Sequence, residues 1–230
     1  MKTIGIIGGM SWQSTQLYYE QINTLVGERL GGLHSAQILL YSVDFGVIEK
    51  LQHDGDWDGA TRILADAGVR LARGGADAIL IATNTMHKMV DAIAAASGLP
   101  ILHIADATAQ AICDQGKKRP LLLATAFTME QDFYKGRLID PFGLDPIIPD
   151  DDHRAIIHRV IYDELCMGVV NPDSKQHYQN IIMAYEDKAD CVILGCTEIT
   201  MLIGKDDVNL PVFDTTALHG AAAVDFLLSA

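Results

Sequence analysis

The sequence predicts an α/β protein of two similar domains, each a mostly parallel four-stranded sheet flanked by helices. Short apolar runs alternate with longer segments of helical spacing, which is the pattern of parallel sheets covered on both faces. The 230 residues are 49% hydrophobic, which is enough for a large packed core. Segments of the second half also repeat segments of the first half at a nearly constant offset.

The expected strands are short apolar runs, most of them bounded by residues that favour turns. The first run, residues 3–9, ends in two glycines and is too short for the apolar region of a signal peptide. Strands are expected at residues 3–9, 37–43, 78–82, 101–103, 121–125, 191–195 and 212–213.

The segments between these runs carry apolar residues at helical spacing. The helix that begins near residue 58 stops at Gly74-Gly75, which is a typical C-terminal signal. Helices are expected at residues 12–30, 58–74, 84–97, 105–114, 129–139, 151–168, 172–187 and 217–228.

The internal repeat is marked by shared Ala-Asp and Leu-Pro pairs. Residues 76–83 match residues 189–196 at an offset of 113, and Leu-Pro-Ile at 99–101 matches Leu-Pro-Val at 210–212 at an offset of 111. The first strand has a fainter echo in residues 122–124. We infer a duplication, with one domain formed by residues 1–98 and 210–230 and the other by residues 99–209. Ligands of α/β sheets bind at the carboxyl ends of strands. The repeat therefore predicts that Thr83 and Cys196 lie on opposite sides of one small ligand, in a cleft between the domains.

The composition excludes several classes of function. The net charge is −13, with 17 basic residues scattered among 30 acidic ones, so a nucleic-acid-binding surface is not expected. No run approaches the roughly 20 apolar residues of a membrane span. The four cysteines have no CxxC spacing and the eight histidines are dispersed, so we expect reduced thiols in a cytoplasmic protein and no metal site.

Two strand ends carry residues suited to chemistry. Cys196 precedes Thr197-Glu198, where a helix is expected to begin; a helix N-terminus favours the thiolate, so we expect a lowered Cys196 pKa. The alternative is a buried core thiol. Thr83-Asn84-Thr85 follows the equivalent strand end, where its polar groups suit the binding of a carboxylate. The alternative is that these residues only cap a helix.

Similar loops follow the strands that end near Gly8-Gly9 and at Thr125. His87 falls one turn into its helix. One interpretation is that it faces the site, and the other is that it lies at the surface or packs against other residues; we favour the latter. The motifs GxGxxG, GxxxxGK[ST] and GxSxG are absent from the sequence, so dinucleotide, nucleoside triphosphate and serine-esterase sites are not supported.

The chain resembles the aspartate/glutamate racemase family, whose members work without pyridoxal phosphate. The resemblance covers nearly the whole chain and rests on three motifs: Gly8-Gly9-Met10-Ser11-Trp12, Thr83-Asn84-Thr85-Met86-His87 and Gly195-Cys196-Thr197-Glu198. It implies two pseudo-symmetric domains, a site in the cleft between them, no cofactor and a homodimer that binds a small amino acid. Met10-Ser11 stands where glutamate racemases have Asp-Ser, which favours the aspartate branch.

The resemblance also assigns roles to residues. Two cysteines of the family exchange the α-proton on opposite faces of the substrate; the second falls at Cys196 and the first at Thr83, a hydroxyl that is a poor base near neutral pH. We therefore expect Cys196 as the main acid and base, with Thr83 or a water that it holds at the other face. The expected substrate-binding residues are Met10, Ser11, Gln52, Asn84, Thr85, Thr125, Thr197 and Glu198.

The leading hypothesis is a racemase of aspartate or glutamate. Aspartate racemases tend to have a basic residue near the helix that corresponds to the one expected to end at Gly168. Residues 164–168 contain no Lys or Arg, so in this respect the resemblance weakens the case for aspartate. The alternatives are a racemase of broad specificity, a single-thiol decarboxylase or isomerase of small carboxylates, and an amino-acid-binding protein with weakened catalysis.

Overall fold

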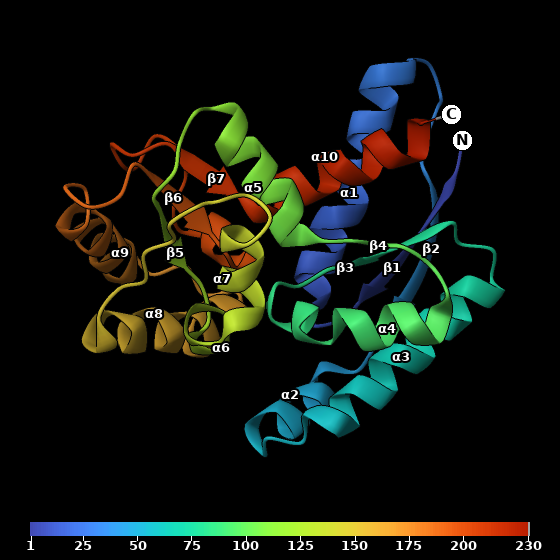
Figure 1. Cartoon of the computed structure of the whole chain (residues 1–230), viewed down its shortest axis with the longest axis horizontal. Coiled ribbons are helices and arrows are strands. Elements are labelled where there is room, and N and C mark those ends of the chain that lie inside the picture. Colours follow the sequence, from blue (N-terminus) through green and yellow to red (C-terminus); the bar gives the residue numbers. More distant parts are fainter. Residues whose placement is uncertain (230) are drawn as a thin grey trace. The chain divides into compact units, whose positions relative to one another are not determined.

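The chain divides into two α/β units in a computed structural model that describes residues 1–229 (Figure 1). Unit 1 consists of Met1–His103 together with the chain from His219 onward, and unit 2 of Ile104–Leu218. Ala230, which the sequence assigned to the first domain, lies outside the described residues. None of the helices within residues 1–229 is both long enough and apolar enough to cross a membrane.

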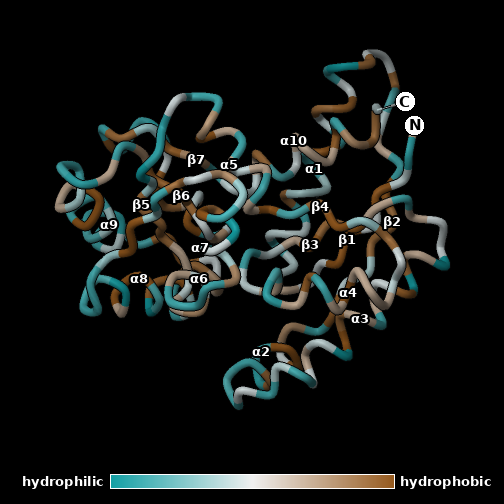
Figure 2. Tube along the Cα trace, in the orientation of Figure 1, coloured by the Kyte–Doolittle hydropathy of each residue, from teal (hydrophilic) through white to brown (hydrophobic). Residues whose placement is uncertain are grey.

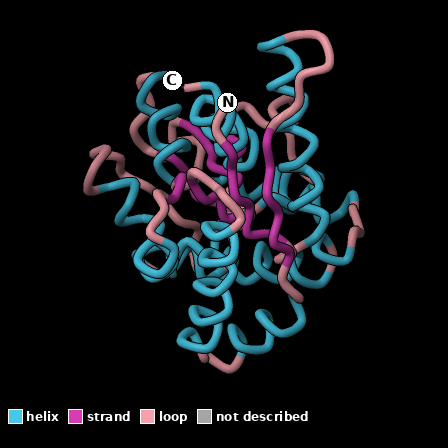
Figure 3. The backbone as a smooth tube through the Cα atoms, turned by 90° about the vertical axis from the view of Figure 1, so that its right-hand side faces the viewer, coloured by secondary structure: helices cyan, strands magenta, loops and turns pink. Residues whose placement is uncertain are grey.

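Unit 1 is built on a four-stranded parallel sheet of order β2-β1-β3-β4. Figure 3 shows strands in magenta with helices in cyan around them. The strands are β1 (Thr3–Gly8), β2 (Gln37–Ser42), β3 (Ala78–Ile81) and β4 (Ile101–Leu102). The helices are α1 (Trp12–Leu30), α2 (Phe45–His53), α3 (Trp57–Arg73), the 3₁₀ helix η1 (Thr85–Met89), α4 (Val90–Ser97) and most of α10 (Thr215–Leu228).

Alternate residues of the central strands face two separate cores. Ile7, Ile79 and Ile81 pack with residues of α2, α3 and α4, whereas Ile6 and Leu80 pack with residues of α1 and α10. Both faces of the sheet are therefore buried, as the near-continuous apolar runs of β1 and β3 predict. Figure 2 shows these strands in the brown of hydrophobic residues.

Unit 2 has a three-stranded parallel sheet of order β5-β6-β7. Its strands are β5 (Pro120–Leu123), β6 (Cys191–Leu194) and β7 (Val212–Asp214). Its helices are α5 (Ile104–Asp114), α6 (Ala126–Glu130), α7 (Asp132–Ile139), α8 (Asp151–Asp163), η2 (Leu165–Met167), α9 (Pro172–Ala184) and η3 (Thr197–Met201). The prediction of four strands is wrong for this sheet, because the chain beside β5 makes only a single bridge, between Leu121 and Ile147.

The repeated segments occupy equivalent places in the two sheets. β3 and β6 each lie between an earlier and a later strand, and each is followed by a five-residue 3₁₀ helix. The two Leu-Pro pairs make the same backbone contact in each unit. The Ile79 N–H donates to the Pro100 carbonyl and the Val192 N–H donates to the Pro211 carbonyl, both at 2.9 Å.

The two repeated aspartates hold the start of a neighbouring strand. The Asp77 carboxylate accepts the Thr3 N–H at 2.7 Å, and the Asp190 carboxylate accepts the N–H groups of Lys118 and Arg119 at 2.8 and 2.9 Å. The Ala-Asp and Leu-Pro pairs thus mark backbone contacts that both units need.

Some boundaries differ from the expected ones. The sequence analysis missed α2 altogether. The expected helix at 84–97 starts with η1, and the expected helix at 151–168 breaks at Glu164 into α8 and η2. The domain boundaries expected at residues 98 and 209 also differ, because β4 pairs with β3 of unit 1 and β7 pairs with β6 of unit 2.

Candidate functional site

The predicted site residues fall into two groups, one in each unit, and most of them follow the carboxyl ends of strands. Unit 1 contains Met10, Ser11, Gln52, Thr83, Asn84 and Thr85, and unit 2 contains Thr125, Cys196, Thr197 and Glu198. The carboxyl ends of neighbouring parallel strands share one sheet edge, so each group has a defined local arrangement.

Hydrogen bonds hold the loop after β1 against the start of α1. Gly9 has φ +93°, and a Cβ atom there would overlap with the Val43 carbonyl oxygen. The Gly9 N–H donates to the Thr15 hydroxyl at 2.8 Å, and that hydroxyl donates to the Ser11 carbonyl at 3.0 Å. Ser11 caps α1 by accepting the Ser14 N–H at 3.2 Å. Met10 and Ser11 are both buried, so their positions are fixed by the backbone around them.

The chain after β3 bends sharply at Thr83. Its N–H donates to the Ile81 carbonyl at 2.8 Å, and its carbonyl accepts a hydrogen bond from Nδ1 of His87, also at 2.8 Å. Thr83 is half-buried, while Asn84 and Thr85 are buried. His87 is only 3% exposed, so it is a packed residue and not a surface one.

Gln52 lies in α2, a helix that begins after an Asp44 N-cap. The side chain is buried, with 4% of its surface exposed. The structure places this residue in unit 1 with the segments Met10-Ser11 and Thr83-Asn84-Thr85, but on a helix and not at a strand end.

Cys196 and Glu198 form the chemically most distinctive pair. The Cys196 thiol donates to Oε2 of Glu198 at 2.9 Å, and the Thr197 hydroxyl donates to the same oxygen at 2.7 Å. The thiol is half-buried, whereas Thr197 and Glu198 are buried. All three follow β6 directly, so the short loop places the carboxylate beside the sulfur.

The pKa of Cys196 is raised well above its usual value, and not lowered as the sequence predicted. Burial is the largest cause, followed by the charge of the Glu198 carboxylate and its hydrogen bond to the thiol. The 3₁₀ helix that follows is only five residues long, so its dipole is too weak to offset a carboxylate in contact with the sulfur. The resting form of Cys196 is therefore the thiol.

Cys166 and Tyr178 are further groups near Cys196 that the sequence analysis did not assign to the site. Burial is the largest cause of the raised pKa of the Tyr178 hydroxyl, with a smaller contribution from Cys196, and Cys166 makes a small contribution to the raised pKa of Cys196. Burial itself raises the pKa of Cys166 to about 12. All four cysteines are free.

Thr125 begins α6 at the end of β5. Its carbonyl accepts the N–H groups of Thr128 and Met129, both at 3.0 Å, and the next N–H, that of Ala126, donates to Nδ1 of His158 at 3.2 Å. His158 is thus tied to this strand end, and it lies on α8, 32 residues further along the chain. Ala126, Glu130, Asp151, Arg154, Ala155 and His158 line a hollow of about 510 Å³.

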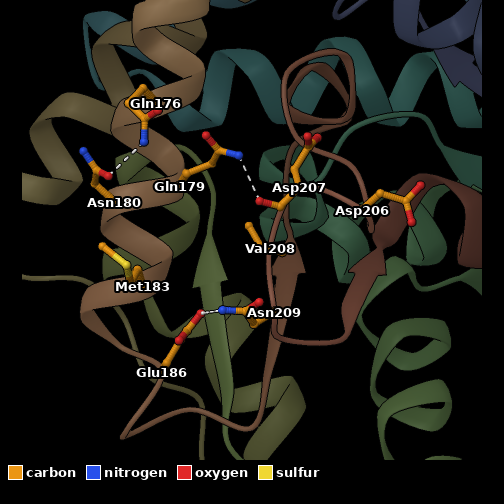
Figure 4. A pocket seen from close by; sticks show the side chains of 9 residues that line it. All are labelled: Gln176, Gln179, Asn180, Met183, Glu186, Asp206, Asp207, Val208 and Asn209. Carbon is orange, nitrogen blue, oxygen red and sulfur yellow. Dashed lines mark hydrogen bonds between the residues drawn. The ribbon is translucent and has the colours of Figure 1, made fainter.

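Unit 2 has a second hollow, and neither of the two hollows is lined by a predicted site residue. Figure 4 shows this hollow, of about 340 Å³, between α9 and the chain that precedes β7. Several of its polar side chains are bonded to one another or to the backbone: Gln179 donates to the Asp207 carbonyl at 2.9 Å and Asn209 to Glu186 at 3.1 Å. These contacts fasten the chain between η3 and β7 to α9.

Comparisons with known proteins agree with the α/β fold described above. The family model for Asp/Glu/hydantoin racemases matches residues 7–223. A crystal structure from Yersinia pestis, described as a candidate Asp/Glu racemase, is 51% identical with a TM-score of 0.93, and each chain covers 100% of the other. An aspartate racemase homologue from Pyrococcus horikoshii OT3 is 33% identical with a TM-score of 0.86, again over 100% of both chains. The broad-specificity amino-acid racemase RacX of Bacillus subtilis is 23% identical over 235 residues, which is 98% of each chain. The chain belongs to the Asp/Glu/hydantoin racemase family.

Proposed function

We propose that the protein is a cofactor-independent amino-acid racemase acting on aspartate or glutamate, with Cys196 as its main acid and base. The observation that carries the proposal is the contact of the Cys196 thiol with the Glu198 carboxylate at the end of β6. Membership of the racemase family supports the reaction class. Asn84, Thr85, Thr125 and Thr197 are proposed to hold the carboxylate and amino groups of the substrate.

The raised pKa of Cys196 requires a way to form the thiolate. The ammonium group of a bound amino acid offsets the negative charge of Glu198, which lowers the free energy of the thiolate. The thiol proton then passes to the Glu198 carboxylate, which already accepts a hydrogen bond from it at 2.9 Å. The thiolate removes the α-proton: the Cα–H bond breaks, the S–H bond forms, and the electron pair remains on the substrate.

The opposite face of the α-carbon needs a proton donor. Thr83 occupies the position of the family's first cysteine, and its hydroxyl is too weak an acid and base to replace a thiol directly. We propose that a water held by Thr83 donates a proton to the α-carbon. The hydroxide left behind takes up, through solvent, the proton that Glu198 received from Cys196, so the thiol, the carboxylate and the water return to their resting forms.

The test is proton NMR of L-aspartate and L-glutamate with enzyme in D2O, followed by chiral analysis. Loss of the α-proton signal with formation of the D isomer supports the proposal. Cys196→Ala is expected to lower the rate about 10²- to 10⁴-fold, which is the usual contribution of a general acid or base. The matched control is Cys113→Ala, because Cys113 is another free thiol of unit 2, and its sulfur donates to the Phe142 carbonyl at 3.9 Å. Full activity in Cys196→Ala would exclude the mechanism.

A second candidate is a racemase of broader substrate specificity. The 3₁₀ helix η2 packs against η3, which follows Cys196, and it carries Met167, with exposed Val169 and Val170 next in the chain. An apolar segment near the thiol offers no cation for a side-chain carboxylate, so it does not select aspartate or glutamate. The name of the relative RacX points the same way. A panel of L-amino acids in the same NMR assay separates the two: exchange of neutral amino acids at rates comparable to aspartate favours the broader enzyme.

A further inference from the structure

A cluster of four buried rings lies next to the end of β3 in unit 1. Tyr18 comes from α1, His87 from η1, His103 from the chain after β4, and His219 from α10. Tyr18 and His219 are 0% exposed, and His87 and His103 are buried as well. A buried imidazole needs a hydrogen-bond partner at each polar nitrogen, so such a cluster is costly unless it is well bonded.

The two nitrogens of His219 have defined roles. Nε2 lies 2.8 Å from the Leu102 carbonyl, which only accepts, so Nε2 carries the hydrogen. Nδ1 is therefore an acceptor, and the Tyr18 hydroxyl at 2.9 Å donates to it. Burial and the neighbouring His87 lower the pKa of His219 to about 3, so the ring stays neutral. His219 is thus fixed between α1 and the end of β4.

His87 is packed against this fixed ring. Its ring centroid lies 5.7 Å from that of His219 in an edge-to-face arrangement and 4.6 Å from that of His103. Nδ1 of His87 donates to the Thr83 carbonyl at 2.8 Å. The pairing of β3 with its neighbours extends only to Ile81, so the Thr83 carbonyl lies beyond the sheet and His87 supplies its partner.

A metal site does not explain the cluster. Nδ1 of His87 and Nε2 of His219 carry hydrogens that they donate, and the lone pair of His219 Nδ1 accepts from Tyr18, so none of these three nitrogens is available to an ion. Within residues 1–229, no group of three or more His, Cys, Asp and Glu side chains is placed to hold a metal.

We propose that His87 is a positioning residue for Thr83: it holds the Thr83 carbonyl and thereby the direction of the Thr83 side chain, while His219 and Tyr18 hold His87. The inference rests on the proposed function, in which Thr83 serves one face of the substrate. Because Cys196 belongs to the other unit and has its own partner in Glu198, loss of His87 should affect the Thr83 face selectively.

The test measures two rates in D2O: exchange of the α-proton with retention of configuration, which needs only Cys196, and inversion, which needs both faces. In His87→Leu the inversion rate is expected to fall about 100-fold, since a displacement of about 1 Å has an effect of this size. The rate of exchange with retention should change less than about threefold, because a rate on the Cys196 face does not depend on that geometry. His87→Asn keeps an N–H near the position of Nδ1 and should restore most of the inversion rate.

A second variant covers the case in which His87→Leu does not fold. Tyr18→Phe removes one hydroxyl and should lower inversion more than retention, whereas the control Tyr134→Phe, which removes another fully buried hydroxyl in unit 2, should change neither. An equal fall of both rates in His87→Leu and Tyr18→Phe, or no change in either, would overturn the role of His87. Absence of any α-proton exchange in the wild-type protein would instead overturn the proposed function, and this inference with it.

Discussion

Replacing Glu198 by glutamine is expected to make the Cys196 thiol more reactive. The Glu198 carboxylate lies 2.9 Å from the sulfur, so a thiolate at Cys196 meets a like charge. The thiol form, by contrast, is stabilised by donating a hydrogen bond to that carboxylate. Both effects raise the Cys196 pKa. Glu198→Gln removes the charge while nearly preserving the size of the side chain, so the pKa should fall.

The geometry sets the size of this change. Two unit charges 2.9 Å apart repel each other by about 1.4 kcal/mol in a medium like water and by about 6 kcal/mol at an effective dielectric constant of about 20. Relief of this repulsion lowers the pKa of Cys196 and raises the thiolate fraction about tenfold for each 1.4 kcal/mol. Cys196 is half-buried, so we expect an energy nearer the smaller of the two values and a gain of about tenfold to a hundredfold in the thiolate fraction.

The reactivity gain is smaller than the gain in thiolate. Each unit of pKa lowering raises the thiolate fraction about tenfold but lowers the intrinsic nucleophilicity about threefold. The net increase in the alkylation rate is therefore about threefold to tenfold in Glu198→Gln.

The assay is alkylation by iodoacetamide at pH 7.5, followed by mass spectrometry of the peptide that contains Cys196. Cys113, a free thiol elsewhere in unit 2, serves as the internal reference. Glu186→Gln is the matched control, because Glu186 is bonded to Asn209 in the hollow of Figure 4 and not to Cys196. An unchanged or slower rate at Cys196 in Glu198→Gln would refute the electrostatic account of this site.

Three further predictions concern stability. Gly9→Ala should lower the free energy of unfolding by about 2–4 kcal/mol, because of the positive φ and the overlap with the Val43 carbonyl. Gly31 has a similar φ but open space around it, so Gly31→Ala should lower the free energy of unfolding by only about 1 kcal/mol. Equal falls in Tm for the two variants would contradict this. His219 is neutral when folded and protonates on unfolding below pH 6.5, so stability should fall as the pH drops, by about 2 kcal/mol between pH 7.5 and pH 5 from this group. Chemical denaturation of wild type and His219→Gln checks it, and equal pH slopes for the two proteins would exclude His219 as the source. Asp190→Ala should lower the Tm more than Asp77→Ala does, because Asp190 accepts two backbone N–H groups and Asp77 accepts one. Each of these bonds contributes about 1 kcal/mol to the free energy of unfolding. The reverse order of Tm values would show that these bonds do not dominate the effect of the two substitutions.

The sequence predicted the elements whose apolar pattern is strong. The helix over residues 12–30 agrees with α1 at both ends, and every expected strand exists to within about two residues at each end. These elements are specified locally, by apolar runs and by the residues that end them. The prediction of a fourth strand in the second sheet was wrong. The chain at Ile147 makes only a single bridge to the sheet, and a single bridge leaves no periodic pattern in the sequence.

Short and interrupted helices were predicted poorly. α2 has only nine residues, and Asp44, its N-cap, is the main local signal for its start. The break between α8 and η2 falls at Glu164, inside a segment of continuous helical spacing. Packing against η3 favours the break, and such tertiary contacts are not visible in a local pattern.

The candidate site was predicted in its residues but not in its electrostatics. The motifs identified Thr83 and Cys196 at equivalent places, after β3 and β6. The direction of the Cys196 pKa was wrong, although Glu198, two residues further on, was the available signal. The contact of His87 with His219 joins residues 132 positions apart, so no local pattern indicates it.

The order of the chain through the two units has a consequence for how the protein is made. Unit 2 is continuous from Ile104 to Leu218, whereas unit 1 is completed only by α10, whose Val224 and Leu227 belong to the same core as Ile4 and Ile22. Arg29 of α1 also pairs with Asp225 of α10 at 2.5 Å, and Lys2 N donates to the Leu227 carbonyl at 3.0 Å. On the ribosome, the segment synthesised second is therefore able to finish folding first, while the first hundred residues wait for the last helix to emerge. A fragment that stops near residue 103 should remain incompletely folded, and a fragment of residues 104–218 is the better candidate for independent expression.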